Sequence, residues 1–184
     1  MNAYNNHIDK LLRGFLREEE ETEVKRYPVP ERDDSDLFIH IPDSWERLCE
    51  KYQPLPWEDG LGFEHDWMTL WTAPQGFPFK RIYCNTDVAS DLDLIFEGIL
   101  MEGLEEEIKK FDGCFNIRKV RGSKKRWSLH SFGLAVDFNA STNKMGTFGD
   151  MHPAVVDIFR CYGWVWGGEF KRKDPMHFQR ALNC

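Results

Sequence analysis

The sequence has no long apolar run and no excess of basic residues. None of its 184 residues lies in an uninterrupted apolar stretch of about 20 residues, the length that a membrane-spanning helix needs. The segment Met1–His7 lacks the basic start and apolar run of a secretory signal. The formal net charge of −7 argues against general affinity for nucleic acid. We therefore expect a protein that is made in the cytoplasm, does not insert into membranes and does not bind nucleic acid.

Closely paired cysteines are also missing. The chain has five cysteines, namely Cys49, Cys84, Cys114, Cys161 and Cys184. They are scattered and odd in number, and no two of them form a Cys-x-x-Cys pair. Disulfide frameworks and cysteine zinc sites both use defined cysteine spacings. The sequence therefore predicts neither.

The composition is sufficient for one globular domain with a core, since 41% of the residues are hydrophobic and 30% are charged. Seven of the nine prolines lie between Pro28 and Pro78, which predicts an extended, loop-rich segment. We expect residues 1–80 to form an N-terminal helix, with an apolar face from Ile8 to Phe15, and a proline- and tryptophan-rich extension. This extension would pack on a domain formed by residues 81–184. Its tryptophans are expected to anchor it there rather than to bind sugar.

Patterns typical of strands and helices alternate after residue 80. A short helix is first predicted to open near Ser44, within the extension. A helical stripe then runs from Leu92 to Phe111, and Pro153 to Tyr162 predicts another helix with proline in its first turn. Strands are predicted at residues 81–84, 114–120, 134–139, 165–166 and 176–178. This order predicts an α+β fold in which helices flank a small antiparallel sheet.

Side chains that bind metals are concentrated in two of these segments. His130 and Asp137 are seven residues apart, and His177 follows forty residues after Asp137. Strand alternation would place Asp137 on one face, while Gly133 permits a tight turn that brings His130 beside it. His177 would stand on a second strand. Nitrogen and oxygen ligands of this kind suit Zn²⁺, and three of them leave the fourth position open, as in catalytic sites.

One carboxylate lies just before the last histidine. Asp174 is three residues from His177, and Pro175 favours extended backbone at Asp174 before a turn. The Asp174 carboxylate could then act as general base toward the zinc-bound water. Glu169 is the competing candidate for this role, although its glycine and aromatic neighbours also suit a turn.

The pattern Ser-x-His-x-x-Gly-x-Ala-x-Asp from Ser128 to Asp137 is followed by Asp-x-x-His from Asp174 to His177. Together they resemble the zinc D-alanyl-D-alanine peptidases and L-alanyl-D-glutamate endopeptidases of peptidoglycan, a family that includes phage endolysins. The Gly-Trp-Val-Trp-Gly-Gly sequence at residues 163–168 is similar to the family's glycine- and tryptophan-rich segment before the last ligand. The resemblance runs from about residue 117 to residue 179.

This resemblance implies roles for individual residues. The two histidines and the aspartate named above would be the zinc ligands, and Asp174 the catalytic base. An upstream arginine would stabilise the anionic intermediate, with Arg118 as the first candidate and Arg121 as the alternative. We also expect Ser128, Arg121 and Trp166 to contact the substrate.

The function implied is that of a zinc metallopeptidase that cleaves peptidoglycan stem peptides, at either the D-Ala-D-Ala or the L-Ala-D-Glu bond. We expect a monomer that acts on the cell wall after release from the cell. A non-catalytic, zinc-containing binding module of the same fold is the alternative. The basic run Lys124–Arg126 predicts either a solvated loop or, at the mouth of the site, an attraction for an anionic wall polymer.

Overall fold

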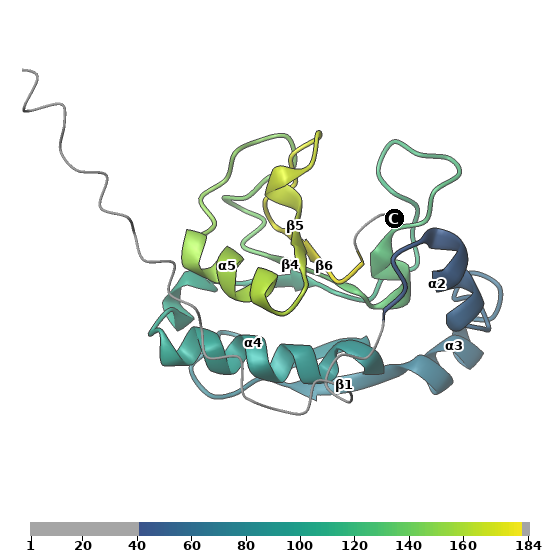
Figure 1. Cartoon of the computed structure of the whole chain (residues 1–184), viewed down its shortest axis with the longest axis horizontal. Helices are drawn as coiled ribbons and strands as arrows, with labels where there is room; N and C mark the ends of the chain where they lie inside the picture. The colour runs from purple at the N-terminus through teal and green to yellow at the C-terminus, as the bar shows by residue number, and fades with distance from the viewer. Residues whose placement is uncertain (1–40, 182–184) are drawn as a thin grey trace, which may run out of the picture. The chain divides into compact units, whose positions relative to one another are not determined.

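The structure, a computed structural model, describes residues 41–181, which belong to one compact unit. The helix expected at Ile8–Phe15 lies outside this range. The described part is α+β, as predicted, with small antiparallel sheets flanked by helices (Figure 1). No helix within residues 41–181 is long and apolar enough to cross a membrane.

Outside the larger sheet, the described residues form four α-helices, short 3₁₀ helices and a two-stranded antiparallel sheet. The helices are α2 (Trp45–Lys51), α3 (Gly60–Trp67), α4 (Ala89–Met101) and α5 (Pro153–Cys161). The two-stranded sheet consists of β1 (Met68–Thr72) and β2 (Arg81–Asn85). Ser44 caps α2 by accepting a hydrogen bond from the backbone N–H of Arg47, so this short helix begins where the sequence predicts.

The larger sheet determines where the predicted ligands lie. Its four antiparallel strands occur in the order β3 (Phe111–Gly113), β4 (Ala135–Phe138), β6 (His177–Gln179) and β5 (Val165–Trp166). On the central strands, Asp137 pairs with His177 and Val136 pairs with Phe178. Residues directly opposite each other across two strands project from the same face. Asp137 and His177 therefore share one face, and the apolar partners share the other.

Two helices cover the apolar face of this sheet. Phe159 of α5 stacks on Phe178 with ring centroids 4.1 Å apart, and Phe96 of α4 lies 6.0 Å from Phe138. All four rings are fully buried. Burying each phenylalanine side chain contributes about 1.5–3 kcal/mol. This packing provides a rigid support behind the strands that carry Asp137 and His177.

The helical stripe predicted from Leu92 to Phe111 is wrong beyond Met101, where α4 ends. Gly103 follows the helix with a φ of +66°, a left-handed conformation that ends many helices. Of the remaining apolar residues of the stripe, Leu104 and Ile108 flank the 3₁₀ helix η2 (Glu105–Glu107), and Phe111 begins β3.

The strand predicted at residues 114–120 is also wrong, since only a single bridge, between Lys119 and Trp127, occurs there. Side-chain hydrogen bonds replace the ladder. The hydroxyl of Ser131 accepts from the Arg118 N–H at 3.0 Å and donates to the Arg118 carbonyl at 3.0 Å. The segment is thereby tied to the turn that carries His130.

Aromatic contacts join residues 41–80 to the rest of the unit. Trp57 stacks between Trp45 and Trp127, with centroids 6.0 and 4.6 Å away. Trp45 and Trp57 also meet the buried ring of Phe132 edge-on. The boundary expected at residue 80 lies in the connection between β1 and β2, so the expected extension and the expected domain share a sheet.

The turn before β4 depends on Gly133. This residue has a φ of +66°, and a Cβ atom there would lie 2.8 Å from the backbone nitrogen of Asn85 and 2.8 Å from the Met68 side chain. Asn85 donates its N–H to the Gly133 carbonyl at 3.1 Å and its side-chain amide to the Phe132 carbonyl at 3.0 Å. The end of β2 therefore fixes the turn that carries His130.

We expect Gly133→Ala to lower the free energy of unfolding by about 3 kcal/mol, because left-handed strain adds to a clash with backbone. Gly103→Ala is the matched control, since Gly103 has the same φ but a Cβ atom there would meet no atom of the described residues within 4 Å. The control should lose only about 1 kcal/mol. Urea unfolding of both variants checks this, and equal losses would contradict the role given to the Asn85 contact.

Candidate metal centre

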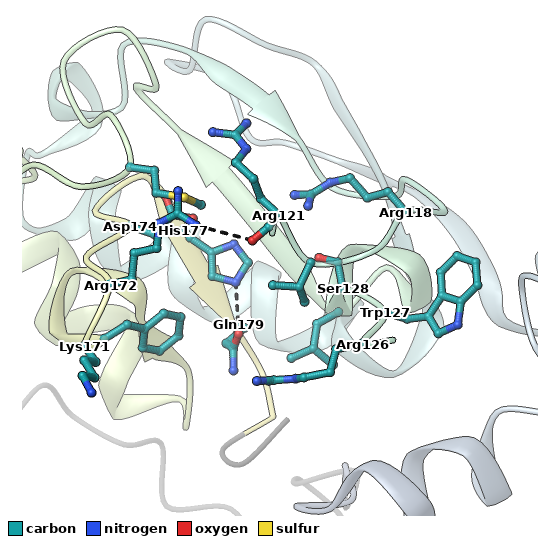
Figure 2. Close-up of a pocket in the computed structure, with 14 residues that line it drawn as sticks. Arg118, Arg121, Arg126, Trp127, Ser128, Lys171, Arg172, Asp174, His177 and Gln179 are labelled. Carbon is teal, nitrogen blue, oxygen red and sulfur yellow. Dashed lines mark hydrogen bonds between the residues drawn. The ribbon is translucent and has the colours of Figure 1, made fainter. Parts of the chain in front are cut away.

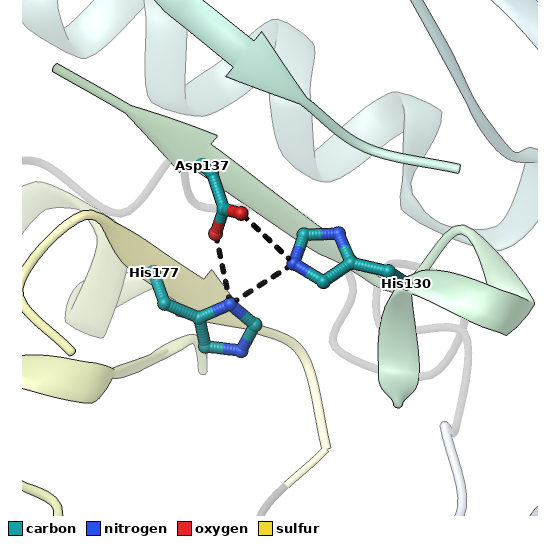
Figure 3. A group of neighbouring side chains, drawn as sticks. All are labelled: His130, Asp137 and His177. Carbon is teal, nitrogen blue, oxygen red and sulfur yellow. Dashed lines mark hydrogen bonds and ion pairs between the residues drawn. The ribbon is translucent and has the colours of Figure 1, made fainter. Parts of the chain in front are cut away.

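Three side chains from β4, β6 and a short helix meet at one point (Figure 3). His130 lies in the 3₁₀ helix η3 (Leu129–Phe132), while Asp137 and His177 project from the paired strands. Their ligand atoms all lie within 4.8 Å of one another. The Asp137 carboxylate places Oδ2 3.2 Å from Nε2 of His130 and Oδ1 2.9 Å from Nδ1 of His177. The structure thus brings the three predicted metal ligands together.

A backbone carbonyl fixes the orientation of the His130 ring. Nδ1 of His130 lies 2.6 Å from the carbonyl oxygen of Cys114. A carbonyl oxygen can only accept, so Nδ1 carries the proton and donates it. In the neutral ring, Nε2 then presents a lone pair toward Asp137 and His177. Metal-binding histidines usually have this kind of outer hydrogen bond.

The side chain of Gln179 fixes the orientation of the His177 ring. Nε2 of His177 lies 3.1 Å from Oε1 of Gln179 (Figure 2). The Gln179 amide nitrogen donates to the Ala181 carbonyl at 2.7 Å, which leaves its oxygen as the acceptor facing His177. Nε2 therefore carries the proton and Nδ1 presents the lone pair. This role of Gln179 is not among the sequence predictions, although its position two residues after His177 on a strand places both on one face.

The result is a cluster of acceptors that suits a cation. Nε2 of His130 and Nδ1 of His177 are 3.2 Å apart, and in the neutral rings neither has a proton to share. Burial raises the pKa of the Asp137 carboxyl, and hydrogen bonding and charge outweigh burial when the two histidines are protonated, so that the pKa falls well below its usual range. With neutral rings, a cation supplies this stabilisation instead. Two imidazole nitrogens and one carboxylate form a ligand set that zinc prefers. The residues present therefore fit the predicted ion.

A pocket of about 530 Å³ opens beside the cluster, with His177 in its lining (Figure 2). Four other predicted site residues also line it: Arg118, Arg121, Ser128 and Asp174. Trp166 is not among the lining residues. Its indole N–H donates to the Pro175 carbonyl at 2.8 Å. The structure thus gives Trp166 a contact that supports the Asp174 turn, and its role in substrate binding stays a prediction.

The glycine- and tryptophan-rich segment holds the backbone of Asp174 in place. The Asp174 N–H donates to the Gly167 carbonyl at 2.8 Å, and the Asp174 carbonyl accepts from the His177 N–H at 3.0 Å. A Cβ atom on Gly167 would lie 2.5 Å from the Asp174 carbonyl oxygen and 3.1 Å from Cβ of His177. Only glycine allows so close an approach. This segment therefore sets the distance between the candidate base and the last ligand.

The Asp174 carboxyl group is available for proton transfer. Its Oδ1 atom is buried and has no hydrogen-bond partner within residues 41–181. Burial raises the pKa of Asp174, and the charge of Asp137 adds to this effect, whereas the charges of His177 and Arg121 oppose it. A general base that works near neutral pH benefits from such a raised pKa.

Glu169, the other candidate for the base, lies outside the pocket. The Glu169 carboxylate is paired with Arg160, with Oε1 2.6 Å from Nη2, and its side chain is 59% exposed. Glu169 does not line the pocket. This placement favours Asp174 over Glu169 as the base.

In this α+β domain the sheet presents one aspartate and one histidine, and a 3₁₀ helix adds a second histidine, beside a pocket with a further carboxylate. These are the groups of a metal-dependent hydrolase site. Residues 121–180 match a family model described as D-alanyl-D-alanine carboxypeptidase, which confirms the predicted resemblance. The matched range includes the three metal-binding candidates, Asp174 and Arg121, and it begins after Arg118. No curated protein and no solved structure matches the chain. At the level of the family, the match indicates a peptidase, with zinc as the metal expected at the cluster.

We expect the purified protein to bind about one zinc ion per chain. His177→Ala should abolish this binding and lower the melting temperature, because the energy of metal binding also stabilises the fold. His65→Ala, which alters a histidine that is exposed and outside the cluster, is the control and should bind zinc as the wild type does. Zinc titration by calorimetry, with circular dichroism to check folding, measures both. Full zinc binding by a folded His177→Ala protein would contradict the site.

Gln179→Leu should weaken zinc binding about 10- to 100-fold without abolishing it, the usual effect of removing the group that orients a metal ligand. Leucine keeps a similar volume but cannot accept the proton of His177. Competition for zinc against a chelator of known affinity gives the ratio. Unchanged affinity would show that Gln179 does not orient the His177 ring.

Proposed function

We propose that the protein is a zinc metallopeptidase that hydrolyses peptide bonds in the stem peptides of peptidoglycan. One observation carries the proposal: three metal-binding side chains converge beside a pocket in which Asp174 has a buried oxygen without a partner among the described residues. The match over residues 121–180 supports the substrate class. Because this substrate lies in the cell wall, the proposal also requires that the protein reach the wall after its synthesis.

The metal ligands and the general base have separate roles in the proposed reaction. His130, Asp137 and His177 would hold the metal, which, when bound, supplies a Lewis acid that polarises the scissile carbonyl and acidifies water. Asp174 accepts the proton of the attacking water and returns it to the leaving amine. Hydrogen bonds to Gly167 and His177 fix the backbone of Asp174, so its Cα keeps one position relative to the ligands.

A cationic side chain would stabilise the anionic intermediate. Arg118 and Arg121 both line the pocket, and the charge of Arg121 acts on Asp174. This coupling makes Arg121 the better candidate, although Arg118 is the first candidate from the sequence. Removing one such donor typically costs about 3 kcal/mol of transition-state stabilisation.

The alternative, a binding module with a purely structural zinc, is less well supported. A structural zinc site is closed by four protein ligands. The cluster within residues 41–181 offers three, and one of them lines an open pocket. The Asp174 oxygen also has no structural partner in this range. Both features suit a reaction better than a scaffold.

Asp174→Asn should lower kcat by at least about 10²-fold, since general acid–base catalysis typically contributes 10²–10⁴. Zinc content and thermal stability should stay close to those of the wild type, because asparagine keeps the shape and the backbone hydrogen bonds. Release of fragments from purified peptidoglycan, followed by mass spectrometry, measures turnover and also identifies the bond that is cut.

Glu169→Gln is the matched control for this experiment, because it removes one carboxylate from the same segment outside the pocket. It should retain nearly full turnover. The assignment of Asp174 as the base would be contradicted if Asp174→Asn kept more than about a tenth of wild-type kcat and Glu169→Gln lost most of it. Glu169 would then be the base.

A further inference from the structure

Cationic side chains dominate the lining of the pocket, in a protein with a net charge of −7. Five lysine and arginine residues contribute to it, against a single carboxylate, that of Asp174. The five are Arg118, Arg121, Arg126, Lys171 and Arg172. A concave surface lined by one sign of charge attracts ligands of the opposite sign.

No ion pair joins these five side chains to acidic residues within residues 41–181, whereas some basic residues elsewhere in this range are paired. Arg160, for example, pairs with Asp157 and Glu169, and Arg180 pairs with Asp91. In the pocket, Arg172 instead donates to the Arg121 carbonyl at 3.4 Å. The contact links the two loops that form the walls. The charges of the pocket are therefore not used to hold acidic side chains of the described fold.

The cations lie on more than one side of the metal-facing histidine. In Figure 2, the guanidinium groups of Arg118 and Arg121 lie on one side of the His177 ring, and that of Arg126 lies on the other. The catalytic proposal uses one arginine, on the first side. It gives no role to Arg126. A neutral peptide would leave this second cation without an anionic partner.

We propose that the pocket selects acidic peptides that carry two carboxylates, one held by Arg118 and the other by Arg126, on opposite sides of His177, while Arg121 remains for the anionic intermediate. The inference rests on the proposed function for the substrate class, but it concerns binding and can be tested without cleavage. Arginine suits this task because its planar group binds a carboxylate through two parallel hydrogen bonds. The acidic character of the whole protein restricts such attraction to ligands small enough to enter the pocket.

The structure also separates the basic run Lys124–Arg126 into two parts. Arg126 lines the pocket, whereas Lys125 is exposed and does not. Lys125→Gln is therefore a matched control for Arg126→Gln, because each removes one positive charge from adjacent positions. If the protein only attracts anions in general, both changes should weaken binding equally. If the anion binds in the pocket, only Arg126→Gln should weaken binding.

The test uses the stem-type peptide acetyl-L-Ala-γ-D-Glu-(Nε-acetyl-L-Lys)-D-Ala-D-Ala, with carboxylates on D-Glu and at the C-terminus. Three further peptides have one or both carboxylates converted to amides. The peptide with two carboxylates is called the diacid, and the peptide with two amides is called the diamide. Their affinities are measured by calorimetry on the full chain loaded with zinc and carrying Asp174→Asn, which prevents hydrolysis during the titration. Arg126→Gln and Lys125→Gln are each added to this protein.

We expect each amide to weaken binding about tenfold, the usual worth of a hydrogen bond to a charged group. Arg126→Gln should lower the affinity for the peptide with two carboxylates about tenfold. It should also make the affinity for one of the two single-amide peptides equal to that for the peptide with two carboxylates. Lys125→Gln should change the affinity less than twofold. Affinity for the diacid should also fall as salt is raised, and that for the diamide should not.

Equal affinity for the diacid and the diamide would overturn the inference, and so would equal effects of the two variants. Either result would leave the proposed function intact if the wild-type protein still releases fragments from peptidoglycan. Selective binding of the diacid without any turnover by the wild type would instead retain the inference and reject the catalytic proposal.

Discussion

The site depends on two hydrogen bonds that point away from it. The Cys114 carbonyl takes the proton of His130 at Nδ1, and Gln179 takes that of His177 at Nε2. Each bond leaves the inner nitrogen of its ring with a lone pair, 3.2 Å from the other and next to the carboxylate of Asp137. Such a set of acceptors is costly to bury unless a cation lies among them. The surrounding fold therefore orients both rings as ligands of a metal ion.

The rest of the fold holds the three ligands in this arrangement. The antiparallel register sets Asp137 opposite His177, and helices α4 and α5 hold the back of the same strands. Gly133 lets the chain turn so that η3 presents His130 from outside the sheet. A second close approach, at Gly167, sets Asp174 beside the last ligand. The site thus combines strands that fix two ligands with two glycine-dependent turns that bring the third ligand and the base to them.

Local patterns predicted the parts of the site that follow strand periodicity. The placement of Asp137 and His177, the turn at Gly133 and the helix from Pro153 each depend on neighbours within a few residues, and the structure contains all of them. The helical stripe beyond Met101 failed because Gly103 ends α4 although apolar residues continue after it. The pairing of Gln179 with His177, and the gathering of cations from two loops, depend on contacts between distant segments or on side-chain orientation. The gathering of cations leaves no periodic signal in the sequence, and strand alternation shows only that Gln179 shares a face with His177.

The histidine tautomers provide the most direct test of this account. Long-range proton–nitrogen NMR spectra of the zinc-loaded protein should show His130 bound to the metal through Nε2 with a proton on Nδ1. They should show the reverse for His177, which we expect to bind through Nδ1 with a proton on Nε2. Opposite tautomers of this kind would support the claim that the two outer hydrogen bonds define the site. Binding of both rings through the same type of nitrogen, or no change in either ring when zinc is added, would contradict it.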